Sequence, residues 1–259
     1  MSASPAQLLA AVTELVRDAG AHALTHFRKH LEVETKGDGS PVTLADRETE
    51  AFARAWITAR FPGDAILGEE LGESGAPRAA RRWLVDPIDG TISFVRGVPL
   101  WGTLVAVVEG DRVLAGAAAI PACGEVVAAA RGEGAWWNGA RCGVSAVAGL
   151  ADACLLSTGT DFRERSDRLA RWRAFAGGAK TRRTWGDAFG YVLVATGRAE
   201  VMMDARLKPW DAAPVQILIE EAGGVFHDWQ GTPTFSGEGG IASNAALAGA
   251  VREALIDPR

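Results

Sequence analysis

Three short segments of the chain place carboxylates directly beside apolar runs. Glu69 follows one such run and Asp211 follows a Pro-Trp pair. The most informative segment, Trp-Leu-Val-Asp-Pro-Ile-Asp-Gly-Thr at 83–91, places Asp86 at the end of an apolar run and Asp89 three residues later. Two acids this close at a strand end repel each other unless a cation lies between them. Carboxylates and a backbone carbonyl are the oxygen ligands that Mg²⁺ prefers.

The residues that follow Asp89 indicate phosphate chemistry. Gly90 and Thr91 open a turn or short helix whose free N–H groups can hold phosphate oxygens. A plainer interpretation exists for each segment, because Asp, Pro and Gly are ordinary turn residues and Asp211 occupies a position typical of a helix N-cap. A metal site requires that the three segments meet, and spacing alone does not decide this.

Two helices are predicted before the first acidic segment. Apolar residues recur at helical spacing from Pro5 to about His30. A second helix begins after Thr43, which is a suitable N-cap with Asp46 at the capping-box position, and ends before Phe61.

The rest of the chain is predicted to form two lobes. Strands are expected first, at 82–85, 101–108, 112–120 and 125–130. Asn138-Gly139 predicts a hairpin turn because both positions tolerate positive φ. Strands and helices then alternate, with strands at 154–157, 200–203, 225–227 and near 241, and helices at 164–175, 187–196, 211–221 and from 244. We therefore expect an N-terminal lobe, 1–145, with most of the metal ligands, and a C-terminal α/β lobe, 146–259, with the last ligand and the selectivity.

Several short motifs follow one another in a fixed order. They are Val-Thr-Leu-Ala-Asp at 42–46, Gly-Glu-Glu at 68–70, the Asp-Pro-Ile-Asp-Gly-Thr run at 86–91, Trp-Asp-Ala-Ala at 210–213 and Glu-Ala-Gly-Gly at 221–224. Together they resemble the inositol monophosphatase family of Mg²⁺-dependent phosphatases, over nearly the whole chain. The resemblance implies an α/β fold, the layered αβαβα sandwich of the inositol monophosphatase and fructose-1,6-bisphosphatase type. It also implies a metal cleft between the lobes and a homodimer.

The resemblance also implies the metal ligands. Glu69, Asp86 and the carbonyl of Ile88 match the ligands of a first Mg²⁺. Asp86, Asp89 and Asp211 match those of a second ion, which lies on the leaving-group oxygen. The family holds a third, weaker ion through the residue that matches Glu69 and through waters, so two to three Mg²⁺ are expected per subunit.

Catalytic roles follow in the same way. Thr91 and Asp46 match the pair that orients and deprotonates the attacking water. Glu69 is also expected to be a catalytic residue. The N–H groups of Gly90 and Thr91 are expected to hold the phosphate oxygens. Lys36 aligns with a family lysine near the metals, and the sequence leaves its direct role open.

Two acids of the second lobe are candidates for substrate selection. Asp204 matches an acid that binds a sugar hydroxyl in inositol phosphatases. Asp187 and the segment 98–104 instead resemble the histidinol-phosphate phosphatase branch, although Asp187 also suits a helix N-cap. An extra carboxylate would pair with the ammonium or imidazole of L-histidinol phosphate. Trp101 and Trp185 are expected near a substrate ring.

The predicted function is therefore hydrolysis of L-histidinol phosphate, a small-molecule ester, to L-histidinol and phosphate, in histidine biosynthesis. Inositol 1-phosphate and a broad range of esters are the alternative substrates. From a different class, the chain could be an interaction partner of the transcription machinery on a phosphatase scaffold.

Composition excludes several other classes. The 259 residues are 48% hydrophobic and 23% charged, as in ordinary globular proteins. A net charge of −5 excludes nucleic-acid or anionic-lipid binding by charge alone. The chain has no secretory signal pattern and no apolar run near the roughly 18 to 20 residues of a membrane span. Three cysteines are too few for a disulfide framework. We expect a cytoplasmic protein without nucleic-acid or membrane partners.

A histidine repeat remains outside this interpretation. His22, His26 and His30 recur at i, i+4 and i+8 on the first predicted helix. Such spacing can bind zinc, but the sequence offers no obvious Cys or acidic partner, so a partly buried helix face is the favoured interpretation.

Overall fold

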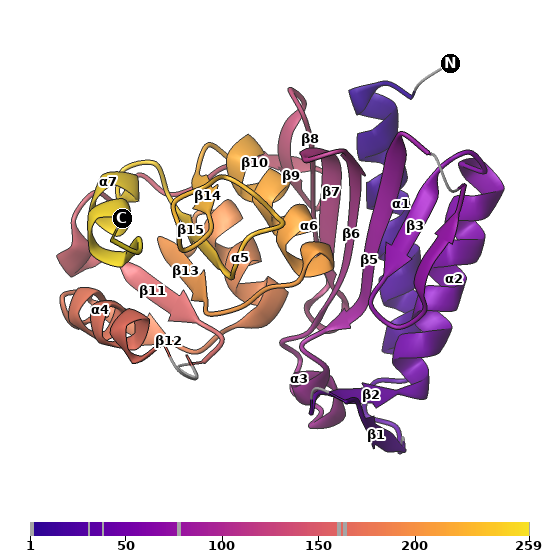
Figure 1. Ribbon diagram of the computed structural model, residues 1–259, viewed down its shortest axis with the longest axis horizontal. Coiled ribbons are helices and arrows are strands. Elements are labelled where there is room, and N and C mark those ends of the chain that lie inside the picture. The colour runs from indigo at the N-terminus through magenta and orange to yellow at the C-terminus, as the bar shows by residue number, and fades with distance from the viewer. Residues whose placement is uncertain are drawn as a thin grey trace.

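The elements of the protein stack in five layers that alternate helix, sheet, helix, sheet and helix (Figure 1). The computed structural model describes residues 3–30, 32–37, 39–76, 79–159, 162 and 165–258. The six longer helices are α1 (Pro5–Leu24), α2 (Leu44–Arg60), α4 (Ser166–Gly177), α5 (Asp187–Ala195), α6 (Pro209–Glu221) and α7 (Ala248–Leu255). Helices α1 and α2 cover the outer face of one sheet, α5 and α6 lie between the sheets, and α4 and α7 cover the other outer face. The predicted αβαβα sandwich is confirmed.

The first sheet has eight strands in the order β10-β9-β8-β7-β6-β5-β3-β4, and all its pairs are antiparallel except β3 with β5. Its strands are β3 (Ala65–Gly68), β4 (Gly72–Gly75), β5 (Arg81–Asp89), β6 (Gly102–Glu109), β7 (Arg112–Ile120), β8 (Glu125–Ala130), β9 (Gly134–Trp137) and β10 (Ala140–Cys142). A separate hairpin joins β1 (Val33–Thr35) to β2 (Pro41–Thr43). The predicted turn at Asn138-Gly139 is present, with φ of 48° and 84°.

The second sheet has five strands in the order β12-β11-β13-β15-β14. They are β11 (Cys154–Ser157), β12 (Thr181–Arg183), β13 (Val201–Asp204), β14 (Val225–His227) and β15 (Gly240–Ser243). Strand β11 pairs in parallel with β12 and β13, as expected where helices connect the strands. No helix in the described part of the chain is long and apolar enough to cross a membrane.

Small residues in β7 allow helices to pack closely on both faces of the first sheet. Helix α1 lies on one face of β7 and α6 on the other. A Cβ atom at Gly116 would lie only 2.6 Å from Ile217 Cγ2 of α6. The close contact explains why the middle of this central strand, residues 115–119, consists only of Ala and Gly.

Several predicted boundaries are corrected. Helix α1 ends at Leu24 instead of His30, because the chain continues there as turns. Helix α6 begins at Pro209, so Asp211 is its third residue and not its N-cap. The last helix begins at Ala248, because Asn244 instead forms a turn in which its side chain accepts from Leu247 N. The predicted start of α4 at Glu164 lies outside the described residues.

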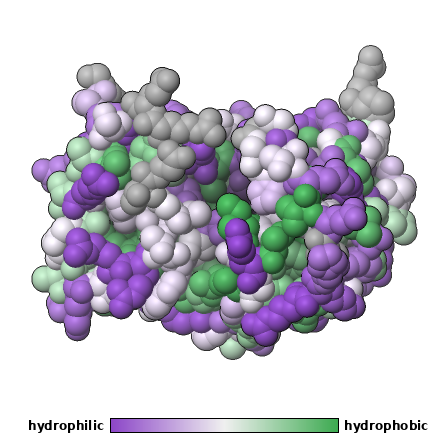
Figure 2. Space-filling view, turned by 90° about the horizontal axis from the view of Figure 1, so that it is seen from below, coloured by the Kyte–Doolittle hydropathy of each residue, from purple (hydrophilic) through white to green (hydrophobic). Residues whose placement is uncertain are grey.

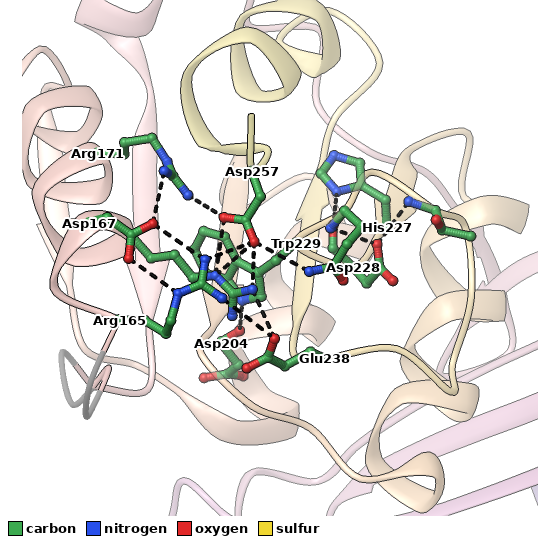
Figure 3. Close-up of polar contacts among 12 residues, drawn as sticks. Arg165, Asp167, Arg171, Asp204, His227, Asp228, Trp229, Glu238 and Asp257 are labelled. Carbon is green, nitrogen blue, oxygen red and sulfur yellow. Dashed lines mark hydrogen bonds and ion pairs between the residues drawn. The ribbon is translucent and has the colours of Figure 1, made fainter. Parts of the chain in front are cut away.

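An ion-pair network joins Asp257, which follows α7, to α4 and to the loop before β15 (Figure 3). It consists of Arg165, Asp167, Arg168, Arg171, Glu238 and Asp257, and is called the Asp257 network below. The Arg168 side chain is 1% exposed and lies 2.6 Å from Asp257 Oδ2 and 2.9 Å from Glu238 Oε2. Its guanidinium also lies over the ring of Trp229, 5.0 Å from the centroid.

Candidate active site

The end of β5 places two carboxylates in a cleft between the layers. The strand does not stop at Asp86 as expected: it continues past Pro87, and its register with β6 shifts between Asp86 and Asp89. The irregularity suits Pro87, which cannot donate a ladder hydrogen bond. Asp86 Oδ1 accepts from the N–H of Ile88 at 3.0 Å, and Asp89 Oδ2 accepts from the N–H of Ala188 at the start of α5.

Asp211 of α6 completes a group of three acids. Oxygen atoms of Asp86, Asp89 and Asp211, called the carboxylate cluster below, all lie within 4.8 Å of one another. Burial and then the neighbouring carboxylates raise the pKa of Asp86 and of Asp89 well above the ordinary value, and burial raises the pKa of Asp211 to about 7. Among the described residues, none of these three carboxylates forms an ion pair with a Lys, Arg or His side chain. An all-oxygen donor set of this kind fits a hard divalent cation.

Glu69 lies at the rim of the same cleft and is paired with Lys36. Lys36 Nζ lies 2.7 Å from Glu69 Oε1 and also contacts Glu70 Oε1. Burial alone would lower the pKa of Lys36, but hydrogen bonds to both glutamates bring it above the ordinary value. Lys36, Glu69, Asp211 and the carboxylates of β5 line one cavity of about 350 Å³. Lys36 therefore lines the same cavity as the carboxylate cluster and forms an ion pair with Glu69, at its rim.

Sequence reasoning missed Glu50, which fixes the turn that carries Glu69. This fully buried acid of α2 accepts from the N–H groups of Glu70 and Leu71 at 2.6 and 3.1 Å, and from Arg54 Nε at 2.7 Å. A Cβ atom at Gly68 would lie 2.0 Å from Glu50 Oε1, so the turn requires glycine there. The available signal was the spacing of Glu50, four residues after Asp46 on the same helix.

Thr91 and Asp46 come together from distant elements. Thr91 begins the short helix α3 (Thr91–Val95), and its Oγ1 donates to the carbonyl of Ile88 at 3.0 Å. The same hydroxyl lies 3.5 Å from Asp46 Oδ1. Asp46 is buried and caps α2 by accepting from the N–H of Thr43 at 2.8 Å. Burial raises the pKa of Asp46.

The backbone of Gly90 and the side chain of Asp187 lie close together in the cleft. Gly90 has a φ of 80°, and a Cβ atom there would lie 2.9 Å from Asp187 Oδ2. Asp187 also has a positive φ of 53°, and its N–H donates to Thr158 Oγ1 at 2.7 Å. Burial raises the pKa of Asp187 to about 6. No pattern in the sequence pointed to Thr158, which lies in the loop after β11.

Asp204 is the last residue of β13, in the second sheet. Its carboxylate is buried, and its Oδ2 has no hydrogen-bond partner among the described residues. Burial raises its pKa to about 7. Its backbone carbonyl accepts from Trp229 Nε1 at 3.2 Å (Figure 3). The Trp229 ring in turn contacts the guanidinium of Arg168, a member of the Asp257 network. Asp89, Asp187, Asp204 and Asp211 line a single small cavity of about 100 Å³.

The two predicted tryptophans lie outside this cavity. Trp101 is completely buried and packs edge-on against Phe94, with ring centroids 4.8 Å apart. The expectation that it faces a substrate ring is therefore corrected: it supports α3 from beneath. Trp185 is 42% exposed and adjoins Thr184 and Gly186, which line the outer part of the cleft.

Sequence comparisons identify relatives of the whole chain. A family model described as "Inositol monophosphatase family" matches residues 4–257. A Chlorobaculum parvum protein named histidinol-phosphatase is 42% identical over 240 residues, which are 90% of this chain and 91% of that protein. A Mycobacterium tuberculosis protein of the same name is 37% identical over 84% of this chain and 85% of its own length. The Rhizobium meliloti inositol-1-monophosphatase is 33% identical over 97% of both chains.

Structural comparison gives the same grouping. The extragenic suppressor protein suhB from Bartonella henselae superposes with a TM-score of 0.90, at 27% identity, over 97% of this chain and 99% of that one. The Thermotoga maritima IMPase superposes with a TM-score of 0.82, at 30% identity, over 94% of each chain. By its sequence and by its fold, this chain belongs to the inositol monophosphatase family.

Proposed function

We propose that this protein is a Mg²⁺-dependent phosphatase that hydrolyses L-histidinol phosphate to L-histidinol and phosphate. The observation that carries the proposal is the cavity in which Asp187 and Asp204 face Asp89 and Asp211. Asp187 and Asp204 are the two acids of that cavity that the metal ions do not need as ligands. The relatives named histidinol-phosphatase support the same substrate.

The extra acids suit a cationic substrate. L-histidinol phosphate carries an ammonium group and an imidazole ring beyond its phosphate, and a carboxylate at 187 would pair with either cation. A neutral polyol would gain only hydrogen bonds from the same carboxylate. The partly exposed Trp185 at the mouth of the cleft offers a surface for the imidazole.

The carboxylate cluster, Glu69 and the carbonyl of Ile88 would hold two to three Mg²⁺ ions. Bound there, the ions would acidify water and neutralise charge on the phosphate and on the departing alkoxide. Lys36 would release Glu69 toward the metal and keep its contact with Glu70. The N–H groups of Gly90 and Thr91, at the start of α3, would seat the phosphate oxygens.

Thr91 and Asp46 would handle the proton of the attacking water. The Thr91 hydroxyl would accept a hydrogen bond from this water and orient it toward phosphorus. Its own proton would then point to Asp46 Oδ1, 3.5 Å away. The raised pKa of Asp46 makes this carboxylate a stronger base than an exposed aspartate.

The subunit arrangement is part of the proposal. Exposed apolar side chains gather over α3 and the β1–β2 hairpin, beside the cleft (Figure 2), and Ile92 of α3 is 68% exposed. Covering such residues would favour a homodimer in solution. Light scattering of the purified chain gives its molar mass directly.

Phosphate release in Mg²⁺, compared between L-histidinol phosphate and myo-inositol 1-phosphate at equal concentrations, tests the substrate. We expect a preference of about a hundredfold for histidinol phosphate, which one good charge contact of about 2 to 3 kcal/mol supplies. The reverse preference would make the protein an inositol phosphatase. Similar rates on many esters would indicate broad specificity. Absence of turnover would favour a binding role on this scaffold.

A further inference from the structure

A second group of side chains that could hold a metal ion lies where the C-terminal end of α1 meets α2. One ring nitrogen of each of His22 and His26 and a carboxylate oxygen of Glu48 all lie within 4.8 Å of one another. His22 belongs to the last turns of α1, His26 follows the end of that helix, and Glu48 lies in the second turn of α2. None of these residues takes part in the proposed hydrolysis.

The ring of His22 is held in place but its Nε2 atom is unused. This atom is buried and has no hydrogen-bond partner among the described residues. The ring stacks on Phe52 of α2 at an interplanar angle of 10°, with centroids 5.4 Å apart. A buried polar atom without a partner is costly, and a ligand bound at that atom removes the cost. The stacking fixes the direction in which the free nitrogen points.

His26 and Glu48 have the spacing of two ligands on one metal ion. His26 Nε2 lies 3.2 Å from Glu48 Oε2. For Zn²⁺ with bonds of about 2.0 to 2.1 Å, the edge of a tetrahedron is about 3.3 Å. The third ligand atom, a ring nitrogen of His22, lies within 4.8 Å of both.

We propose that His22, His26 and Glu48 form a site for a transition-metal cation such as Zn²⁺, with water as the fourth ligand. Two imidazoles and one carboxylate favour Zn²⁺ over Mg²⁺, because Mg²⁺ prefers oxygen ligands in an octahedron. The bound ion would join the C-terminal end of α1 to α2. Since the first turn of α2 carries Asp46, the site would stiffen the layer that positions this residue.

Titration of the full chain with Co²⁺ in a millimolar excess of Mg²⁺ tests the site. Excess Mg²⁺ occupies the all-oxygen cleft, and Co²⁺ in a tetrahedral nitrogen-containing site absorbs visible light far more strongly than octahedral Co²⁺. We expect one equivalent of strongly absorbing Co²⁺, which Zn²⁺ displaces and Mg²⁺ does not. Zn²⁺ should also raise the midpoint of thermal unfolding under the same conditions.

Four substitutions separate the site from adventitious binding. His22→Gln and His26→Gln should each weaken Zn²⁺ binding by at least about a hundredfold, which is the upper end of the loss seen when only a supporting residue is removed. His30→Gln is the matched control, an exposed histidine of the same segment, and should bind Zn²⁺ as the unaltered chain does. Glu48→Gln changes an exposed side chain and disturbs no packing, so it should weaken binding by about tenfold without loss of fold.

Two results would overturn the proposal. In the first, Mg²⁺ displaces all of the bound Co²⁺, which leaves His26 and Glu48 as a simple ion pair. In the second, Glu48→Gln and a folded His26→Gln chain bind Zn²⁺ with unchanged affinity and keep the rise in unfolding midpoint. Circular dichroism of each metal-free variant shows whether it is folded, so a loss of binding is not confused with unfolding.

Discussion

Carboxylates occur in two dense groups in this protein, and their surroundings push their pKa values in opposite directions. In the cleft, burial raises the pKa of Asp211 and of Asp204 to about 7. In the Asp257 network, burial would also raise the pKa of Asp257, but hydrogen bonds from Arg168 and Arg165 outweigh it and bring the pKa to about 2 (Figure 3). The carboxylates of the cleft lack enough neighbouring positive charge, whereas arginines neutralise the carboxylate of Asp257.

This difference in charge balance indicates that the Asp257 network serves stability and that the cleft serves function. The Asp257 network supplies its own cations, so its charges are satisfied within the fold and hold the C-terminal end in place. The cleft supplies carboxylates without enough cations of its own, which costs stability in the metal-free chain and leaves an attraction for an external cation.

The largest effect is expected from Asp89→Asn. The change keeps an acceptor for the N–H of Ala188 but removes one charged metal ligand, so turnover of every ester should fall by at least about 10⁴-fold. Because it also removes one of the mutually repelling buried charges, the metal-free variant should unfold at a higher temperature than the unaltered chain. Initial rates in Mg²⁺ and thermal unfolding in a chelator measure the two effects. Retained activity would exclude Asp89 from the metal site.

Arg168→Met should have the opposite profile. Removal of a cation buried beside Asp257 and Trp229 should lower the free energy of unfolding by about 3 kcal/mol. Arg82→Met, which breaks an exposed pair with Glu73, is the control and should cost under about 1 kcal/mol. Urea unfolding measures both. Equal costs in the two variants would mean that the Asp257 network is not a stabilising device.

Asp187→Asn should change selectivity more than stability. Asparagine tolerates the positive φ at this position, so the backbone is kept while the charge is lost. We expect kcat/KM for histidinol phosphate to fall about a hundredfold, equivalent to about 2.7 kcal/mol, and kcat/KM for inositol 1-phosphate to change only a few-fold. Equal losses on both esters would remove Asp187 from substrate selection and leave it a structural role at the start of α5.

The smallest effect concerns pH. The folded pKa of Asp204 is about 7, above the ordinary 3.8, so its contribution to stability is full below pH 3.8 and is lost as the pH rises through 7. In a chelator, the free energy of unfolding should therefore be greater at pH 5.5 than at pH 8, by an amount on the order of 2 kcal/mol from this group.

The Asp204→Asn variant isolates that contribution. Burial lowers the pKa of His227, which acts in the opposite direction, so the relevant quantity is the difference in slope between the unaltered chain and the variant. A slope that is the same in both would show that Asp204 does not titrate in this range. Asp257, with its pKa near 2, should add nothing between pH 5.5 and 8.

Local signals predicted most of the elements but not all of their ends. The capping box formed by Thr43 and Asp46 sets the start of α2, and it can be recognised from these two residues, three positions apart in the sequence. The continuation of β5 past Pro87 was not predictable, since it depends on a shifted pairing with β6, a separate strand. Trp101 was misplaced for a similar reason: its segment has a recognisable pattern, but its burial is decided by Phe94 and Phe27 from other elements.

The family and the candidate metal ligands could be predicted from the sequence, because the order of short motifs and the chemistry of their carboxylates are local properties. Only the tertiary structure brought Asp211 within reach of Asp86 and Asp89, placed Glu50 behind the turn of Glu69, and supplied Glu48 as the acidic partner that the histidine repeat lacked. These contacts join residues on different elements. Their distances follow from how the layers pack, and the spacing of residues along the chain does not contain that information.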